Sequence, residues 1–284
     1  MDEFNINILS WIGGREENQD SSGSRETKHG LLVVVCDGMG GTKGGSIASK
    51  LAVETILEEV ANTNHANTAE ILREAITKAN SVVYHAGCTR QDLQGMGTTV
   101  VALLINENKA TAAHVGDSRI YQVRGSKKIF RTFDHSMVFE LVKRGTISEE
   151  QARLSAQSNV ILRAIGTKPE VEIEINEEIH YLKGDRFLLC SDGIWGAVNE
   201  KEMLKLIKNE KSVERTVEHI METIDTIGTG TGGKHDNLTA ALIETNINSK
   251  IQPETGNRIK IIISILSILL FISICLNIWR FIFH

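Results

Sequence analysis

Two stretches of the chain, LLVVVCDGMGG at 31–41 and RFLLCSDGIWG at 186–196, share one pattern. In each, a continuous apolar run of the kind found in buried strands leads to an aspartate and then at once to a glycine. The strand holds its last residue rigidly, and the glycine allows a sharp turn and the close approach of a ligand. Asp37 and Asp192 are therefore predicted to be oxygen ligands on stiff supports.

Three further aspartates stand at the predicted ends of strands. They are Asp117 in VGDSR, Asp236 in HDN, and Asp20 in NQD, which follows the first strand. Carboxylates that gather without histidine or cysteine favour hard divalent cations such as Mg²⁺ or Mn²⁺. Any single Asp-Gly pair is more often a turn. The repetition at several strand ends indicates a metal centre, although spacing alone does not prove that the side chains converge.

Length and composition restrict the class of protein. The 284 residues allow one large domain, or one domain with an appendage. A net charge of −5 gives no basis for nucleic-acid binding, which depends on clustered lysine and arginine. The four cysteines show no CxxC spacing, so we expect reduced thiols in a cytosolic protein rather than a zinc site. The acidic start, MDEFNINILSW, is not that of a signal peptide.

The C-terminal end differs in kind from the rest of the chain. From Ile261 to Trp279 no residue is charged. At about 1.5 Å per residue this run spans roughly 28 Å, close to the ~30 Å hydrocarbon core of a bilayer. A buried core helix would normally be shorter and amphipathic, so the run predicts one transmembrane helix.

The expected domain organisation follows from this run. We expect a catalytic domain at 1–245, a polar linker at 246–258 and a transmembrane helix at 259–281. Basic Arg258 and Lys260 flank the uncharged run on the domain side, which agrees with the positive-inside tendency, whereas Arg280 on the far side weakens this argument. The sequence therefore predicts a single-pass tail anchor in the cell membrane, with the catalytic domain in the cytoplasm.

Predicted strands and helices segregate along the chain. Apolar residues at helical spacing predict helices at 44–61 and 68–86, then at about 136–144, 199–208 and 212–226. Strands are predicted at 4–12, 31–36, 98–105, 109–116, 118–124, 127–133, 170–176, 186–191 and 237–245. The four strands within 98–133 have short joints and are predicted to form a meander. This segregation favours an antiparallel α+β layered domain over a doubly wound nucleotide-binding sheet.

Eight motifs occur in a characteristic order: REENQD (15–20), VVVCDGMGG (33–41), MGTT (96–99), HVGDSRIY (114–121), DHS (134–136), LRAIG (162–166), LLCSDGIWGAV (188–198) and DNLTA (236–240). Together they resemble the metal-dependent protein phosphatases, the type 2C or PPM family, in its bacterial form. The resemblance covers about residues 5–245. It implies a four-layer α-β-β-α sandwich of two antiparallel sheets flanked by helices, with a two-metal centre at one end.

The resemblance also implies a set of metal ligands. Asp37 matches the aspartate that bridges both metals, and the carbonyl of Gly38 would bind the first. Asp192 and Asp236 match the ligands of the second metal. Asp117 matches the residue that, with Asp192, holds a weaker third metal in bacterial members. Two or three Mn²⁺ or Mg²⁺ ions are therefore expected.

Other matched positions concern the substrate and the surroundings of the metals. Arg15 matches the arginine that binds the substrate phosphate, for which its planar fork is suited. Asp20 is expected to contact the metal ligands rather than the metals themselves. Gln19 stands where many members have glutamate, so slightly weaker metal binding is expected. Met39 stands where animal members have a histidine that protonates the leaving group, so the proton would have to come from metal-bound water.

The implied activity is that of a serine/threonine phosphoprotein phosphatase that opposes a Ser/Thr kinase in a bacterium. Two metals about 3.5–4 Å apart lower the pKa of a shared water, so no serine or cysteine nucleophile is needed. The alternatives are a catalytically weak sensor that binds phosphoproteins and a membrane adaptor with the same fold. The intact Asp37, Asp192 and Asp236 argue against the sensor.

Three other signals are weaker. GTGTGGK at 228–234 begins like a phosphate-binding loop, but His235 follows where Ser or Thr is needed, and a strand rather than a helix comes next. His114 and His135 are expected to be hydrogen-bonded structural residues rather than ligands. The polar segment at about 144–160 matches the flap beside the family's active site, and on its own is also typical of a surface loop.

Overall fold

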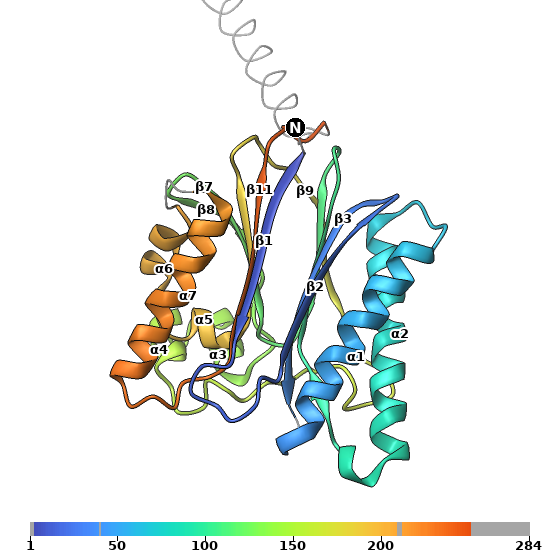
Figure 1. Ribbon diagram of the computed structural model, residues 1–284, viewed down its shortest axis with the longest axis vertical. Helices are drawn as coiled ribbons and strands as arrows, with labels where there is room; N and C mark the ends of the chain where they lie inside the picture. Colours follow the sequence, from blue (N-terminus) through green and yellow to red (C-terminus); the bar gives the residue numbers. More distant parts are fainter. Residues whose placement is uncertain (1–2, 40, 209–211, 251–284) are drawn as a thin grey trace, which may run out of the picture. The chain divides into compact units, whose positions relative to one another are not determined.

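The computed structural model describes residues 3–39, 41–208 and 212–250. Within the unit that ends at Ser249, two antiparallel sheets lie face to face and helices cover their outer faces (Figure 1). The layers therefore follow the order helix, sheet, sheet, helix, which confirms the predicted α+β sandwich.

The strands form one five-stranded and one six-stranded sheet, and all neighbouring strands are antiparallel. The first sheet has the order β1 (Phe4–Trp11), β11 (Leu238–Thr245), β10 (Arg186–Cys190), β7 (Arg119–Arg124) and β8 (Lys127–Arg131). The second has the order β2 (Asp20–Thr27), β3 (Gly30–Met39), β5 (Val100–Ile105), β6 (Ala110–Val115) and β9 (Glu174–Ile179), and the short β4 (Gly97–Thr98) pairs with the end of β3.

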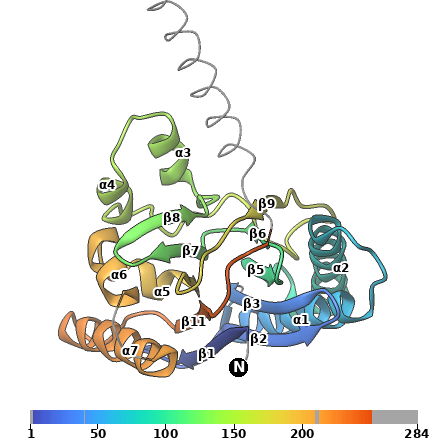
Figure 2. The same ribbon diagram turned by 90° about the horizontal axis from the view of Figure 1, so that it is seen from above.

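Two pairs of helices cover the outer faces of the sheets. They are α1 (Gly41–Asn62) and α2 (Thr68–Thr89) on the second sheet, and α6 (Glu200–Ile207) and α7 (Val213–Gly230) on the first. Shorter helices are η1 (Gln91–Leu93), α3 (Met137–Lys143), α4 (Glu149–Arg153) and α5 (Asp192–Trp195). Seen from above, α3 and α4 project from the sandwich beside β8 (Figure 2). Helix α4 lies within the segment 144–160 that the sequence matches to the family's flap, and α3 directly precedes that segment.

The apolar residues of β3 follow one another without polar residues between them, and the packing of the strand explains this pattern. Its even-numbered residues from Leu32 to Cys36 pack against α1 and α2. Its odd-numbered residues from Leu31 to Val35 pack against residues of the other sheet, such as Phe187. Both faces of the strand are therefore buried, and a continuous apolar run is the expected pattern.

Three details differ from the sequence-based expectations. The four strands within 98–133 are not one meander, because β6 and β7 lie in different sheets. Gly116, with φ +101°, turns the chain across the sandwich between them. The polar segment 20–27 was not predicted as a strand, yet it forms β2 at a sheet edge, where a strand needs only one partner and less apolar surface. Strand β9 begins at Glu174 rather than at 170.

The chain beyond β11 stays attached to the domain for a few residues. The N–H of Asn246 donates to the carbonyl of Glu3, and that of Ser249 to the carbonyl of Tyr181. In the ranges that the structure describes, no helix has both the length and the apolar character needed to cross a membrane. The transmembrane helix predicted at 259–281 and most of the predicted linker lie outside those ranges.

Candidate metal centre

The predicted site residues meet at one end of the sandwich, the lower end in Figure 1, where the β1–β2 loop, the end of β3 and α5 come together. A pocket of about 690 Å³ opens there. Its lining includes six of the seven predicted residues: Arg15, Asp37, Gly38, Asp117, Asp192 and Asp236. The seventh, Asp20, lies behind them and is only 8% exposed.

Pairing of β2 with β3 sets Asp20 directly opposite Asp37. The backbone of Asp37 is held by the MGTT segment: its N–H donates to Thr99 Oγ1 (3.0 Å), and its carbonyl accepts from the N–H of Thr99 (2.8 Å) and from Thr98 Oγ1 (2.8 Å). Asp37 therefore stands on a backbone that is hydrogen-bonded on both sides. The sequence identifies MGTT as a motif, but it does not indicate that this segment supports the backbone of Asp37.

The glycines that follow Asp37 and Asp192 do not make the sharp turns that were expected. Strand β3 continues through Gly38 to Met39, and Asp192 begins α5. Glycine is needed at both positions because another segment of backbone packs closely against it. A Cβ on Gly38 would lie 2.1 Å from the carbonyl oxygen of Gly45, and one on Gly193 would lie 2.1 Å from that of Asn237. The two Asp-Gly pairs thus let neighbouring backbones approach the site.

Asp117 lies where the chain crosses from one sheet to the other. The indole Nε1 of Trp195 donates to the Asp117 carbonyl oxygen (2.9 Å), which joins the crossing to α5. Arg119 stacks on Trp195, with 3.5 Å between the guanidinium carbon and the ring centroid, and forms a two-bonded pair with buried Asp134 (2.8 and 2.7 Å). Trp195 is a positioning residue that the sequence did not reveal.

Asn237 is a second residue whose role the sequence did not reveal. Its Nδ2 donates to the carbonyls of Ile12 (2.8 Å) and Glu17 (3.0 Å), and its Oδ1 accepts from the N–H of Gln19 (2.8 Å). One buried amide thereby clamps the 12–19 loop, which carries Arg15. The motif DNLTA contains Asn237, but nothing local indicates which segment it holds.

Arg15 reaches into the pocket from this loop. Its Nη2 donates to Asp236 Oδ2 at 2.8 Å, and its side chain remains 51% exposed. The guanidinium therefore lies beside the carboxylates, with donors still open to the pocket.

Burial makes the aspartates difficult to ionise. It raises the pKa of Asp37 and of Asp117 well above the usual value, and neighbouring aspartates raise both further. The same cause raises the pKa of Asp192 to about 6 and that of Asp20 to about 7, although Ser191 Oγ donates to Asp20 Oδ2 (2.7 Å) and offsets part of the effect.

This arrangement fits divalent cations. Crowded buried carboxylates are stable as anions only beside positive charge. Among the residues that the structure describes, the buried Oδ1 of Asp192 has no hydrogen-bond partner, as expected of an oxygen placed for a metal. The donor set consists of carboxylate and carbonyl oxygens, which suit Mg²⁺ and Mn²⁺.

A different group, His114, His135 and Glu174, is the one set of three such side chains in the described ranges whose potential ligand atoms all lie within 4.8 Å of one another. The two imidazoles are stacked, with centroids 4.5 Å apart and planes 16° apart. In-plane lone pairs of nearly parallel rings do not converge on one ion. By contrast, carboxylates on opposite sides of a two-ion centre lie farther apart because the ions separate them.

Both histidines instead form hydrogen bonds with backbone groups. His114 Nε2 donates to the Phe133 carbonyl (2.8 Å), and His135 Nδ1 accepts from the N–H of Gly116 (3.2 Å). The hydrogen bonds predicted for the two histidines are therefore present.

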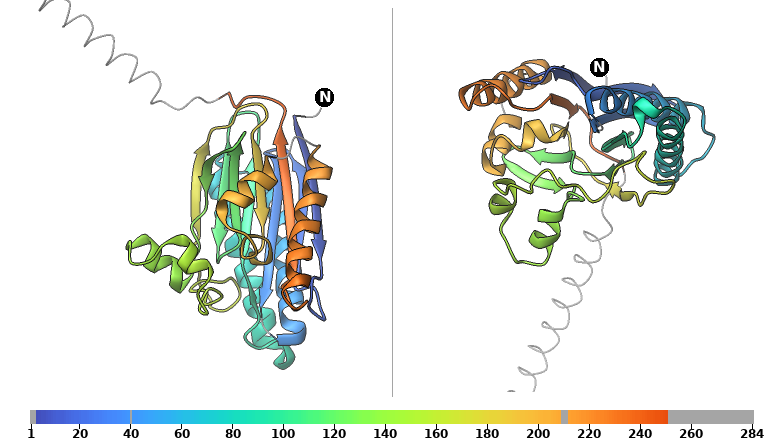
Figure 3. Two further views of the ribbon diagram at one scale, coloured as in Figure 1. Left: turned by 90° about the vertical axis from the view of Figure 1, so that its left-hand side faces the viewer. Right: turned by 90° about the horizontal axis from the view of Figure 1, so that it is seen from below.

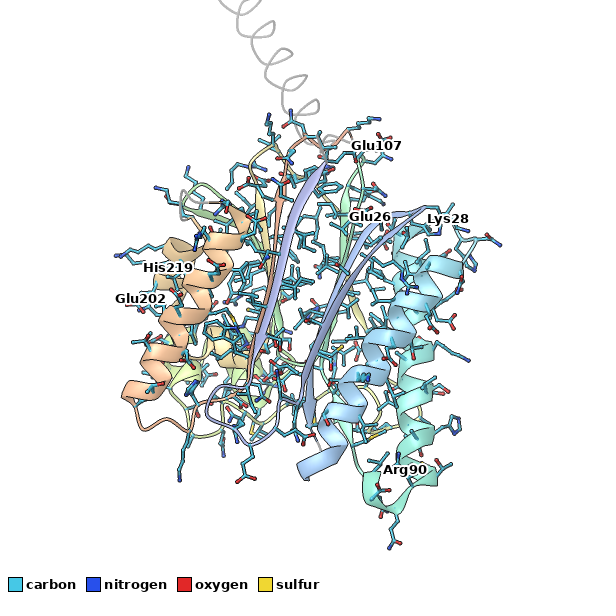
Figure 4. All side chains as sticks on the ribbon, in the orientation of Figure 1. Glu26, Lys28, Arg90, Glu107, Glu202 and His219 are labelled. Atoms are coloured by element: carbon cyan, nitrogen blue, oxygen red, sulfur yellow. The ribbon has the colours of Figure 1, made fainter. Side chains whose placement is uncertain are left out.

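A larger hollow lies away from this centre. It measures about 1270 Å³, and its lining includes Glu26, Lys28 and Glu107. Figure 4 labels these three residues at the opposite end of the sandwich. None of the predicted site residues lines it, so the chemistry rather than the size of the hollow identifies the site.

Comparison with known proteins agrees with the geometry. The family model described as protein phosphatase 2C matches residues 10–242. The chain is similar to the serine/threonine phosphatase stp of Listeria welshimeri, with 35% identity over 241 residues that cover 83% of this chain and 93% of that protein. It is also similar to protein phosphatase PhpP of Streptococcus pneumoniae, with 32% identity over 247 residues, 85% of this chain and 97% of that protein.

Solved structures agree as well. The serine/threonine phosphatase PstP/Ppp of Mycobacterium tuberculosis superimposes with a TM-score of 0.74 at 30% identity, covering 86% of this chain and 99% of that one. A catalytic domain of PstP in complex with two manganese ions gives 0.71 at 28% identity, covering 85% and 97%. Since the family model spans most of the chain and the relatives align over nearly their whole length, this chain belongs to the protein phosphatase 2C family.

Proposed function

We propose that the chain is a metal-dependent serine/threonine protein phosphatase, which hydrolyses phosphoserine and phosphothreonine in proteins. The observation that carries this proposal is the meeting of Asp37, Asp117, Asp192 and Asp236 beside Arg15 in one pocket. Relatives named serine/threonine phosphatases align over more than four-fifths of the chain, and a PstP structure holds two manganese ions. The enzyme uses Mn²⁺ or Mg²⁺.

The proposed metal ligands are those that the family resemblance implies. Asp37 and the Gly38 carbonyl would hold one ion, and Asp37, Asp192 and Asp236 the other, with Asp117 and Asp192 available for a weaker third. Two bound ions supply a water of lowered pKa and balance charge on both sides of an in-line displacement. Asp37 would hold both ions, and its negative charge would offset their repulsion. Asp20 supports this set from behind, opposite Asp37 in the strand pair.

Arg15 would bind the substrate phosphate. Its present partner, Asp236, is itself a proposed metal ligand, so Arg15 would exchange this carboxylate for a phosphate when Asp236 holds a metal. The clamp by Asn237 holds the Arg15 loop in place before substrate arrives, which lowers the entropic cost of binding.

No protein nucleophile is required. Cys36 precedes Asp37, but it is fully buried in the apolar core, and this burial raises the pKa of its thiol. It is a packing residue. Met39 lines the pocket and has no proton to donate, so this chain supplies no leaving-group acid at that position.

The alternatives remain a weak phosphoprotein-binding sensor and a membrane adaptor. A protein that only binds phosphate needs Arg15 but has no use for a set of buried carboxylates with raised pKa values. This electrostatic cost favours the enzyme.

The test is release of phosphate from p-nitrophenyl phosphate and from a phosphothreonine peptide by the full-length protein, with Mn²⁺ and with EDTA. Asp37→Asn should lower turnover by several orders of magnitude. Asp92→Asn changes an exposed aspartate paired with Arg90 and should behave like the wild type. Retention of more than about a tenth of the activity in Asp37→Asn would contradict a two-metal mechanism.

We further propose that a transmembrane helix at 259–281 anchors the enzyme in the cell membrane, with the catalytic domain in the cytoplasm. The uncharged run from Ile261 to Trp279 supports this, as do Arg258 and Lys260 on the domain side. Anchoring would concentrate the enzyme near phosphoproteins at the membrane, including a Ser/Thr kinase.

Fractionation of the full-length protein and of a 1–257 truncation tests the anchor. Full-length protein should sediment with membranes and the truncation should not. Protease added to spheroplasts should leave the catalytic domain intact. Soluble full-length protein, or digestion of the domain from outside, would contradict the proposal.

A further inference from the structure

A second groove adjoins the catalytic pocket. It has a volume of about 380 Å³ and lies between the end of α7, the end of α5 and the segment that follows α4. It shares four lining residues with the catalytic pocket: Arg15, Asn159, Asp192 and Asp236. Because these residues line both hollows, the groove borders the place where the phosphate would bind.

The floor of the groove comes from the apolar stripe of α7. This helix runs alongside β1 and β11 toward the end of the sandwich that carries the aspartates (Figure 3). Its residues Val217, Ile220 and Ile224 are buried in the core beneath it. The stripe continues for one more position, Ile227, which lines the groove and is 37% exposed. Trp195 and other apolar residues of the α5 end complete the floor.

The other charged groups of the walls are paired within the chain. Arg153 donates to the Gly196 carbonyl (2.9 Å) and forms two hydrogen bonds with Glu150 (3.0 and 2.6 Å). His235 Nε2 lies 2.9 Å from Asp225 Oδ1. Arg15, Asp192 and Asp236 belong to the proposed phosphate and metal site, and the remainder of the lining presents little unpaired charge to a ligand. Such a surface suits an uncharged side chain better than a second phosphate.

We propose that this groove binds an apolar side chain of the phosphoprotein substrate, within a few residues of the phosphorylated one. The inference rests on the proposed function, since a phosphorylated residue in the pocket continues as polypeptide on both sides. An extended chain advances about 3.3 Å per residue, so a neighbour of the phosphorylated residue reaches the adjoining groove. The volume is near the lower end of the about 300–1,000 Å³ typical of ligand pockets, which is ample for one side chain. The enzyme thereby selects local sequence as well as phosphate.

Peptide kinetics with full-length protein and Mn²⁺ test this inference. The substrates are phosphothreonine peptides in a Gly/Ser background, with one leucine moved through the three positions on either side, and a leucine-free reference. The proteins are the wild type, Ile227→Gln, Ile227→Ala, and Ile129→Gln as a matched control. Ile129 is 44% exposed on β8 and does not line the groove.

In the wild type, leucine at one position should raise kcat/KM about 10-fold, the lower end of the roughly 10–200-fold effect of one methylene in an apolar pocket, because this groove is open. Ile227→Gln should reduce that preference to about two-fold, Ile227→Ala should give an intermediate value, and Ile129→Gln should retain it. All four proteins should hydrolyse the reference peptide and p-nitrophenyl phosphate equally well.

Three results would overturn the inference while leaving the phosphatase intact. They are the absence of a leucine preference in the wild type, a preference that survives Ile227→Gln, and a larger stimulation by a second phosphothreonine at the same position. Loss of activity on p-nitrophenyl phosphate in both Ile227 variants would also overturn it, because the groove would then not be separate from the catalytic pocket. A wild type that hydrolyses neither the reference peptide nor p-nitrophenyl phosphate would overturn the proposed function, and this inference with it.

Discussion

Without metal, the buried aspartates should make the protein less stable as the pH rises. Burial raises the pKa of Asp20 from 3.8 to about 7 and that of Asp192 to about 6. A carboxyl group with a raised pKa binds its proton more tightly in the folded than in the unfolded state. Its contribution to stability is therefore fully present below about pH 4 and is lost as the pH rises through the folded-state pKa. For Asp20 this window runs from about pH 4 to about 8.

The size of the effect follows from the pKa. At about 1.4 kcal/mol per pH unit, the rise for Asp20 corresponds to on the order of 4 kcal/mol of unfolding free energy across the whole window. About 2–3 kcal/mol of this should be lost between pH 5 and 8. For a domain of this size the melting temperature should fall by roughly 5–10 °C.

Two histidines act in the opposite direction. Burial lowers the pKa of His114, and it lowers that of His135 to about 4, so their contribution to stability is lost as the pH falls below about 6.5. The informative quantity is therefore the difference between the wild type and Asp20→Asn, in which the histidine contributions cancel. The asparagine oxygen can still accept the hydrogen bond from Ser191.

The assay is thermal unfolding of the full-length protein in EDTA at pH 5, 6, 7 and 8, followed by circular dichroism. Relative to Asp20→Asn, the wild type should lose stability steadily with rising pH, and Asp92→Asn should follow the wild type. Mn²⁺ should shrink or reverse the difference, because cations bind the deprotonated ligands of the folded state. A difference that stays constant from pH 5 to 8 would refute the reasoning, since Asp20 would then not be a buried member of a crowded group.

Three further variants test individual contacts. Arg15→Ala should chiefly raise KM for phosphopeptides, since phosphate binding common to the ground and transition states is lost; an unchanged KM with a large fall in melting temperature would indicate a structural role instead. Asn237→Ala removes three hydrogen bonds at about 1 kcal/mol each, partly replaced by water, so urea unfolding should show a loss of about 2 kcal/mol and KM should rise as well. Unchanged stability in that variant would rule out the clamp. Asp117→Ala should retain two tight metal sites in calorimetry and lose turnover on phosphopeptides, whereas loss of a tight site would place Asp117 among the main ligands.

Local pattern in the sequence was sufficient to predict most of the regular elements. The unbroken apolar run before Asp37 predicted a buried strand, and the helical spacing of apolar residues predicted α1, α2 and α7. These patterns are informative because buried residues recur about every 3.6 positions in a helix and about every two positions in a strand with one buried face. The polar sequence of β2 shows no such pattern, because a strand at the edge of a sheet can form with less apolar surface. The arrangement into a sandwich was expected from the order of eight motifs, which is a resemblance rather than a calculation.

Only the tertiary structure decided which of these elements meet, and at which atoms. Gly116 sends β6 and β7 into different sheets, although their short joint predicted neighbouring strands. The amide of Asn237 clamps a loop that begins at Ile12, and Ile227 emerges beside the catalytic pocket rather than under a strand. The sequence alone determined the chemistry available to this protein, namely aspartates on rigid strand ends and an arginine in a loop. Their convergence depends on contacts between residues far apart in the chain, and the local periodicity of a sequence carries no information about which distant faces pack together.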